Sequence, residues 1–254
     1  MAKTLLSADE LRSIPIDPFS ILTASDRERL LRAARTNVTI LLLGETGTGK
    51  GQLARALASR SRLPDLIEVN CASLPDELLG SELFGHRRGS FTGAVADRKG
   101  VLPSAADKTV FLDEIGEISP RMQAMLLNVV QRSHRTFKPL GSDAPVDLPP
   151  MRFIFATNRN LEIEARAGRF RDDLLRRIDV GTFRIEPLRE RPELISPLTG
   201  RFIEEFARLH KIEVAGISRA ALSRLEAHGW PGNVRDLKNA IERAIVTAPR
   251  EEPI

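Results

Sequence analysis

The sequence predicts an α/β fold, a doubly wound parallel sheet followed by a small α-helical domain. Short apolar runs of strand length alternate with segments of helical periodicity, a glycine-rich stretch follows the first such run, and strand signals stop near Glu186. The 254 residues, of which 42% are hydrophobic, suffice for one large core and one smaller one. We therefore expect a lead-in or linker stub at residues 1–18, an α/β domain at 19–185 and a helical domain at 186–254.

The α/β part is expected to contain four helices and four strands in alternation. In chain order these are helix Ser25–Ala34, strand Val38–Leu43, helix Lys50 to about Arg60, strand Leu66–Asn70, helix Pro75–Leu83, strand Val110–Leu112, helix Pro120–Gln131 and strand Arg152–Ala156. Continuous apolar runs are typical of central parallel strands, and ligands of such sheets bind beyond the carboxyl ends of the strands. The proline-rich stretch 139–151 is expected to be a loop.

The helical part is expected to contain three amphipathic helices, at Pro192–His210, Ser218–His228 and Asn233–Thr247. Ser218 is of the right type to cap the second helix. The third helix has its apolar residues on one face, namely Val234, Leu237, Ile241, Ala244 and Ile245.

Composition excludes several classes of protein. No apolar run is long enough to span a bilayer, and the N-terminus lacks the core of a signal peptide. The single cysteine, Cys71, suits a reducing compartment, so we expect a cytoplasmic protein without membrane association. A net charge of +4, with only seven lysines among 38 basic residues, does not by itself predict nucleic-acid binding.

The glycine-rich stretch GETGTGKG predicts a phosphate-binding loop. It follows an apolar strand and precedes a helix, the context in which backbone N–H groups surround nucleotide phosphates. Lys50 is placed to reach the β- and γ-phosphates of ATP, whereas a plain glycine-rich turn would need neither flanking element. The expected nucleotide-binding residues are Gly44, Glu45, Thr46, Gly47, Thr48, Gly49, Lys50 and Gly51. Gly51 stands where such loops usually carry the Ser or Thr hydroxyl that binds Mg²⁺.

A carboxylate pair follows the buried strand in VFLDE, residues 110–114. Because Gly51 has no side-chain hydroxyl, we expect Asp113 to hold Mg²⁺, directly or through water. Glu114 is expected to orient and deprotonate the attacking water. Two exposed acids at the start of a loop are the alternative, which the upstream phosphate loop disfavours.

The stretches SELFGHRRGSFTGA, residues 81–94, and FLDEIGE, residues 111–117, closely resemble the AAA+ domain of sigma-54-dependent transcriptional activators, the bacterial enhancer-binding proteins. The resemblance covers roughly residues 20–248. It implies an AAA+ P-loop fold with a helical lid, and a surface loop that contacts sigma-54. That loop is matched by Gly89, Ser90, Phe91, Thr92, Gly93 and Ala94, with serine in place of the family's first alanine. A hairpin whose phenylalanine packs into the core is the alternative.

Further roles follow from the resemblance, one position at a time. Asn70 matches the asparagine that restrains the catalytic glutamate, and Asn158 matches the sensor of the γ-phosphate or attacking water. Arg171 and Arg177 match the two fingers that enter the neighbouring subunit's site. Arg235 matches the second sensor, on the lid. Fingers supplied in trans require a head-to-tail ring, which in this family is a hexamer.

The resemblance implies an ATPase that remodels the sigma-54 RNA polymerase holoenzyme and drives open-complex formation. Two alternatives stay open: an AAA+ ATPase that remodels another protein or RNA-processing complex, and a slow nucleotide-dependent switch. Family members usually also carry a sensory domain and a helix-turn-helix, so DNA contact is expected only through domains absent from these residues. We expect either an excised motor domain or a natural minimal form.

Overall fold

The computed structural model describes residues 5–6, 17–130, 136–214 and 216–247. The chain forms two compact units, a sheet unit of residues 22–44 and 50–184 and a helical unit of residues 1–21, 45–49 and 185–254. Most of the predicted lead-in lies outside the described residues. The boundaries expected after residues 18 and 185 remain predictions.

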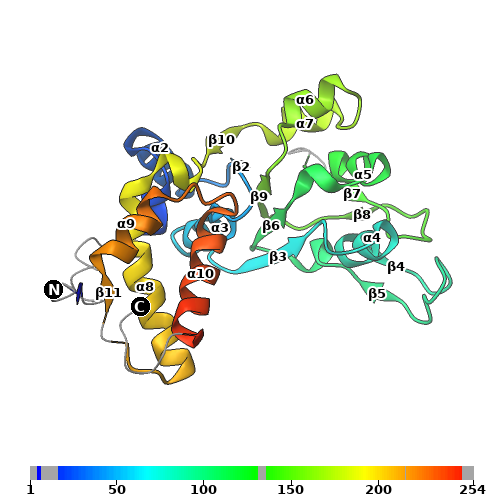
Figure 1. Ribbon diagram of the computed structural model, residues 1–254. Coiled ribbons are helices and arrows are strands. Elements are labelled where there is room, and N and C mark those ends of the chain that lie inside the picture. The colour runs from blue at the N-terminus through cyan, green and yellow to red at the C-terminus, as the bar shows by residue number, and fades with distance from the viewer. Residues whose placement is uncertain (1–4, 7–16, 131–135, 215, 248–254) are drawn as a thin grey trace. The chain divides into compact units, whose positions relative to one another are not determined.

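The sheet unit is built on five parallel strands in the order β10-β2-β9-β6-β3 (Figure 1). The strands are β2 (Ile40–Leu43), β3 (Leu66–Asn70), β6 (Thr109–Asp113), β9 (Arg152–Thr157) and β10 (Gly181–Arg184). The predicted parallel sheet is confirmed. The edge strand β10 was not expected, because its sequence GTFR has no continuous apolar run.

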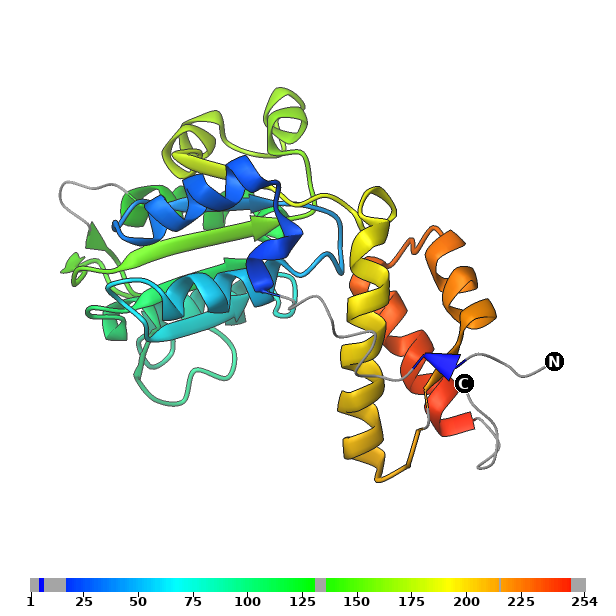
Figure 2. The ribbon, with the colours of Figure 1, turned by 90° about the vertical axis from the view of Figure 1, so that its left-hand side faces the viewer.

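Helices lie on both sides of these strands (Figure 2). They are α2 (Ala24–Ala34), α3 (Lys50–Ser59), α4 (Asp76–Phe84), α5 (Pro120–Val130), α6 (Leu161–Arg166) and α7 (Asp172–Ile178), with short 3₁₀ turns η2 (Leu102–Ser104) and η3 (Ile115–Glu117). Strand β9 is buried at every residue, as expected for a strand covered on both faces. Gln131, the expected end of α5, lies outside the described residues.

Buried Arg152 ties the start of β9 to the end of α2. Its guanidinium donates to the carbonyl oxygens of Ala33 and Ala34 at 3.2 Å and to that of Val38 at 3.3 Å. Burial lowers the pKa of Arg152 to about 10, so the side chain stays charged at neutral pH. The last carbonyls of a helix need such donors.

Two antiparallel ladders extend the sheet unit. The pair β4 (Gly85–His86) with β5 (Arg98–Lys99) forms the base of the predicted sigma-54-contacting loop. The pair β7 (Thr136–Phe137) with β8 (Val146–Asp147) places a short strand inside the proline-rich stretch 139–151, so the expected loop is interrupted by β8. Two-residue ladders carry no periodic signal, so sequence reasoning missed both.

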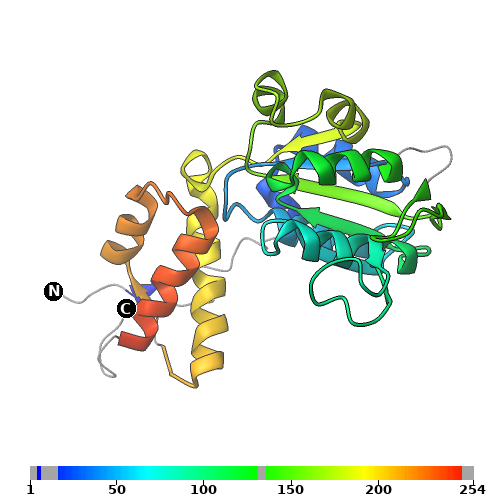
Figure 3. The same cartoon turned by 90° about the vertical axis from the view of Figure 1, so that its right-hand side faces the viewer.

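The helical unit contains η1 (Pro18–Ile21), η4 (Leu188–Glu190), η5 (Pro192–Leu194), α8 (Ile195–His210), α9 (Arg219–Ala227) and α10 (Asn233–Thr247). Helices α8 and α10 lie side by side (Figures 1 and 3) and bury Phe202, Leu237 and Ile241 in a core of their own. Ser218 caps α9 as predicted, because its Oγ accepts from Ala221 N at 3.2 Å. The expectation that strands stop after Glu186 is wrong at one point: β11 (Ile217–Ser218) pairs with β1 (Leu5–Leu6). Among the described residues, no helix is both long and apolar enough to cross a membrane.

Candidate functional site

The glycine-rich loop joins the carboxyl end of β2 to the first residue of α3. Gly44 N donates to Thr157 O at 3.2 Å, which fixes the start of the loop to the neighbouring strand β9. Gly47 and Gly49 have φ values of +82° and +101°, which side chains on Cβ disfavour. Because α3 starts at Lys50, its first N–H groups have no partner within the helix, as in anion-binding helix termini.

Lys50 is buried at the end of this loop, with 5% of its surface exposed. Its Nζ donates to Gly44 O at 2.9 Å and lies 3.7 Å from Glu114 Oε1. A buried ammonium needs such acceptors. The Lys50 ammonium, after β2, therefore lies beside the Glu114 carboxylate, which follows β6, and β9 is the strand between β2 and β6.

The acidic pair follows β6 at the same edge of the sheet. Asp113 Oδ1 accepts from Glu114 N at 3.0 Å, and the register places Asp113 next to Asn70 of β3. Glu114 has φ +54° and ψ +46°, the left-handed region that is uncommon for a residue with a Cβ. Its carboxylate accepts from Asn158 N at 3.2 Å. Backbone strain of this kind clusters at functional sites.

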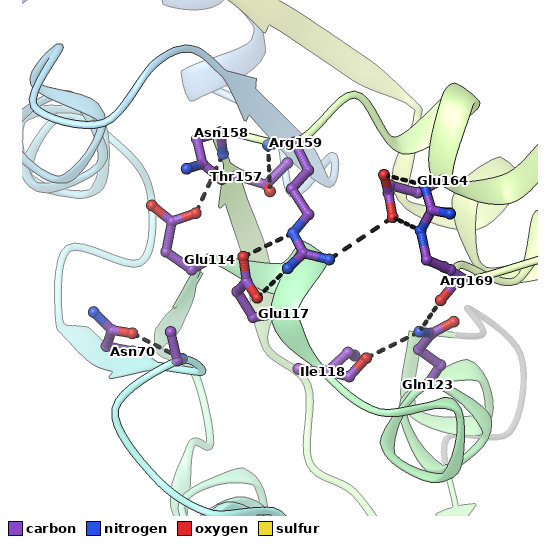
Figure 4. A network of polar contacts seen from close by, with 11 residues as sticks. Asn70, Glu114, Glu117, Ile118, Gln123, Thr157, Asn158, Arg159, Glu164 and Arg169 are labelled. Atoms are coloured by element: carbon purple, nitrogen blue, oxygen red, sulfur yellow. Dashed lines mark hydrogen bonds and ion pairs between the residues drawn. The ribbon is translucent and has the colours of Figure 1, made fainter. Parts of the chain in front are cut away.

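The two predicted asparagines lie differently toward Glu114 (Figure 4). Asn158 follows β9, and its backbone N–H contacts the Glu114 carboxylate. Asn70 accepts from Ala72 N at 2.9 Å through its side-chain oxygen, so its amide faces its own turn. The structure therefore joins Asn158 to the acidic pair, while Asn70 stands next to it by register.

In the helical unit, residues 45–49 of the loop contact the start of α10. Asn233 is fully buried and donates to Thr46 O at 3.1 Å and to Glu45 Oε2 at 3.2 Å. Arg189 forms a bidentate ion pair with Glu45 at 2.7 and 2.8 Å. The sequence pointed to neither Asn233 nor Arg189, because both contacts span more than a hundred residues.

The Cβ atom of Arg235 lies close to Gly47 of the loop. A Cβ placed on Gly47 would lie 3.2 Å from Arg235 Cβ and 2.2 Å from Gly232 O, so only glycine fits at position 47. Arg235 is exposed, and its guanidinium forms no ion pair with any described residue. Arg235 therefore carries an exposed guanidinium on a residue whose Cβ lies near the loop.

The two predicted finger arginines are both exposed in the sheet unit. Arg171 is the residue before α7, and its guanidinium forms a bidentate pair with Asp173 at 3.0 and 2.8 Å. This pair lowers the pKa of Asp173, chiefly through the hydrogen bond from Arg171. Arg177 lies in the last turn of α7 and makes no ion pair within the described part of the chain.

The predicted sigma-54-contacting loop, residues 89–94, is a compact turn closed by a hydrogen bond from Gly89 N to Ala94 O at 2.8 Å. Thr92 is exposed. Phe91 is half-buried, with its ring 4.9 Å from that of His86 in an edge contact, and so is not part of the core. Ser90 Oγ is buried without a hydrogen-bond partner among the described residues.

A network behind the acidic pair was not predicted (Figure 4). Arg159 bonds the Glu117 carboxylate with Nε at 2.7 Å and with a second nitrogen, and it approaches Glu164 at 3.7 Å. Arg169 pairs with Glu164 at 2.6 and 2.9 Å. Buried Gln123 joins this group through backbone atoms. No motif in the sequence marks these residues as a unit.

Cys71 lies directly after β3 and is buried. Burial, helped by the nearby charges of Asp113 and Glu114, raises the pKa of its thiol to about 12. A protonated, buried thiol is inert as a nucleophile.

Residues 21–184 match the family model described as "Sigma-54 interaction domain", and residues 189–254 match "AAA+ ATPase lid domain". The chain is 42% identical over 254 residues to transcriptional regulatory protein ZraR of Klebsiella oxytoca, covering 97% of this chain and 56% of that protein. It is 44% identical over 221 residues to nitrogen fixation protein AnfA of Azotobacter vinelandii, covering 86% of this chain and 41% of that protein. The chain thus spans about half the length of these curated relatives.

Solved structures of AAA+ proteins are similar to this chain as well. NtrX from Brucella abortus, crystallised in complex with ATP, superimposes with a TM-score of 0.82 at 29% identity, covering 96% of this chain and 56% of that one. Hsp104 of S. cerevisiae, at 18% identity and a TM-score of 0.64 over 94% of this chain and 46% of that one, shares the fold. The chain therefore belongs to the sigma-54 interaction domain family, the AAA+ ATPase domains of sigma-54-dependent transcriptional activators.

Proposed function

We propose that this chain is a Mg²⁺-dependent, ATP-hydrolysing motor that remodels the sigma-54 RNA polymerase holoenzyme through residues 89–94. One observation carries the proposal. The same unit holds the Lys50–Glu114 pair at the sheet edge and a glycine-flanked turn with Thr92 exposed. Remodelling of another protein or RNA-processing complex is not favoured, because the matched family model covers both features.

Lys50 is proposed to bind the β- and γ-phosphates, with Glu114 as the base for the attacking water and Asn158 as the sensor beside it. The 3.7 Å between Lys50 Nζ and Glu114 Oε1 supports a shared site, because phosphate and carboxylate then compete for one cation. Asn70 is proposed to restrain Glu114, supported by its register next to Asp113.

The donor set fits Mg²⁺ held mainly by the substrate. No cluster of three or more His, Cys, Asp or Glu side chains gathers in the described ranges, and Gly51 has no side-chain oxygen. Asp113 is half-buried at the sheet edge and uses one carboxylate oxygen for Glu114 N. Mg²⁺ usually keeps several waters and takes one or two carboxylates plus phosphate oxygens, so Asp113 alone suffices. The ion would neutralise charge on the transferring phosphate.

Arg171 and Arg177 are proposed to enter the site of a neighbouring subunit in a homo-oligomeric ring, and Arg235 to contact the phosphates from the lid. Exposure of the first two supports action in trans, and the Arg235 Cβ beside Gly47 supports action at the loop. Arginine fingers contribute roughly 10³- to 10⁵-fold in turnover.

ATP binding and turnover test the nucleotide site. Lys50→Ala should abolish nucleotide binding, and Glu114→Gln should keep binding while lowering kcat by about 10²-fold or more. Glu162→Gln, on the exposed side of α6, is the matched control and should behave like the wild type. Full turnover in Glu114→Gln would overturn the assignment.

Capture of sigma-54 tests the partner. The chain should retain sigma-54 only with an ADP–metal fluoride mimic of the transferring phosphate, and Thr92→Ala should lose it. Thr36→Ala, another exposed threonine, is the control. Capture that is independent of the mimic, or that survives Thr92→Ala, would refute the proposal.

A further inference from the structure

Gln123 is a buried polar side chain whose amide nitrogen and amide oxygen both form hydrogen bonds. Its exposed fraction is 1%. Its Nε2 donates to Ile118 O and to Arg169 O, each at 3.0 Å, and its Oε1 accepts from Arg171 N at 2.8 Å. Figure 4 shows the two carbonyl oxygens converging on the amide nitrogen. A buried amide with both donors and its acceptor satisfied holds its partners rigidly.

The three partners belong to two segments that matter for hydrolysis. Ile118 follows the turn η3, which begins directly after Glu114. Arg169 and Arg171 belong to the connection between α6 and α7, and Arg171 is the N-cap residue of α7 without a side-chain cap. Gln123 of α5 therefore clamps the backbone of the finger segment to the segment that carries the acidic pair.

The ion pairs near Gln123 are less able than Gln123 to hold the segment of Arg171 against the segment that carries the acidic pair. Arg159, Glu117 and Arg169 have side-chain exposures of 39%, 33% and 59%. Exposed pairs of this kind contribute little and are screened by salt. The side chain of Arg171 is not held rigidly either, because both Arg171 and its ion-pair partner Asp173 are exposed. The position of the finger thus depends on its backbone anchor.

We propose that Gln123 is the positioning residue of the Arg171 finger, holding its backbone where the guanidinium can enter the neighbouring subunit's nucleotide site. This inference rests on the proposed function, in which Arg171 acts in trans. It predicts that loss of Gln123 acts mainly on the adjacent subunit's turnover, and not through Ile118 on the site of its own chain.

The test uses Gln123→Met, which keeps the length of the side chain and removes all three hydrogen bonds. Alone, the variant should bind nucleotide with the wild-type Kd and show kcat lowered by roughly 10- to 100-fold, the cost of a misplaced catalytic group. It is then mixed before assembly with Glu114→Gln, which has an intact finger and a disabled site. In mixed rings the Gln123→Met site receives the finger of a Glu114→Gln neighbour.

Random 1:1 assembly makes about one quarter of the interfaces productive, because each partner occupies its position half of the time in a head-to-tail ring. Recovery to about a quarter of wild-type turnover supports the inference. Arg171→Ala mixed with Glu114→Gln is the matched control and should recover equally. If the control pair does not recover, the trans-finger part of the proposed function fails. If only the control recovers, the role of Gln123 is overturned.

A purely structural role is distinguished in the same experiment. Leu126→Ala removes buried core contacts on the same helix and should lower Tm while leaving kcat of the folded protein unchanged. Should Gln123→Met not fold, Gln123→Leu replaces it, since it also removes all three hydrogen bonds. Wild-type turnover in either folded variant overturns the inference.

Discussion

Asn233 offers the sharpest test of how the helical unit is held together. It is fully buried with φ +55°, and its side-chain oxygen accepts from Leu188 N at 2.8 Å while its amide donates to Thr46 O and Glu45. Asn233→Gly removes these bonds without backbone strain. An unpaired buried N–H costs about 1–3 kcal/mol and each lost bond about 1 kcal/mol, so the expected loss of unfolding free energy is about 3–5 kcal/mol.

Asn233→Ala loses the same bonds and adds the left-handed penalty of about 1–2 kcal/mol. Glycine loses about 0.5–1 kcal/mol more backbone entropy on folding than alanine does. The alanine variant should therefore be less stable than the glycine variant by about 0.5–1 kcal/mol, the difference between these two effects.

Urea unfolding followed by tryptophan fluorescence measures both variants. Trp230 is the single tryptophan of the chain, is buried in the helical unit, and accepts a bond from Asn233 N at 2.8 Å. Asn239→Ala, exposed on the same helix, is the control and should shift stability by no more than about 0.5 kcal/mol. A loss below about 1 kcal/mol in Asn233→Gly, or an alanine variant more stable than the glycine one, would refute the reasoning.

Three further predictions concern the sheet unit. Because burial raises the pKa of Cys71 to about 12, iodoacetamide at pH 8 should leave the folded chain unlabelled and label it in urea; mass spectrometry measures this, and rapid labelling of the folded chain would contradict the burial. Ser90 Oγ is buried without a hydrogen-bond partner among the described residues, so Ser90→Ala should leave the free energy of unfolding unchanged or raise it by up to about 1 kcal/mol, with sigma-54 capture retained. Thermal unfolding measures this, and a clear fall in Tm would show that Ser90 forms a hydrogen bond. Asp173→Asn frees the Arg171 guanidinium from its exposed partner, so ring turnover should rise by at most a few-fold in a steady-state ATPase assay, whereas a fall would mean that Asp173 holds the finger in its working position.

Elements with a long or continuous pattern could be predicted from the sequence, and short ones could not. Strand Leu66–Asn70 and helix Asn233–Thr247 have the predicted bounds. Strand β10 was missed because GTFR is half polar and lies at the sheet edge. Helices α6 and α7 are 6 and 7 residues long, too short for a periodic signal to stand out.

Some residues of the candidate site could likewise be predicted from the sequence, and others could not. Residues that belong to contiguous motifs, such as Lys50 and Glu114, could be named because each motif carries its own chemistry, although their roles remain predictions. Gln123 and Asn233 could not, because most of their partners are distant along the chain. Arg169 and Arg171 lie 46 and 48 residues from Gln123, and the partners of Asn233 lie 45 to 188 residues away. An amide is unremarkable in sequence, and only the fold shows which backbone groups meet it.

The space around the glycines differs between Gly47 and Gly116 on the one hand and the loop of residues 89–94 on the other. Gly47 and Gly116 are crowded, because a Cβ would lie 2.2 Å from Gly232 O and 2.7 Å from Thr157 Oγ1, so they allow close packing. Gly89 and Gly93 have φ values of +80° and +99°, yet a Cβ on either would meet nothing within 4 Å. At both glycines the backbone conformation is therefore the constraint. Residues 90–92 do have neighbours, because the Phe91 ring contacts that of His86 and a Cβ on Gly141 would lie 2.7 Å from Ser90 Cβ. A change of conformation in residues 90–92 would thus cost the contact between Phe91 and His86 but would meet no obstruction at the two flanking glycines.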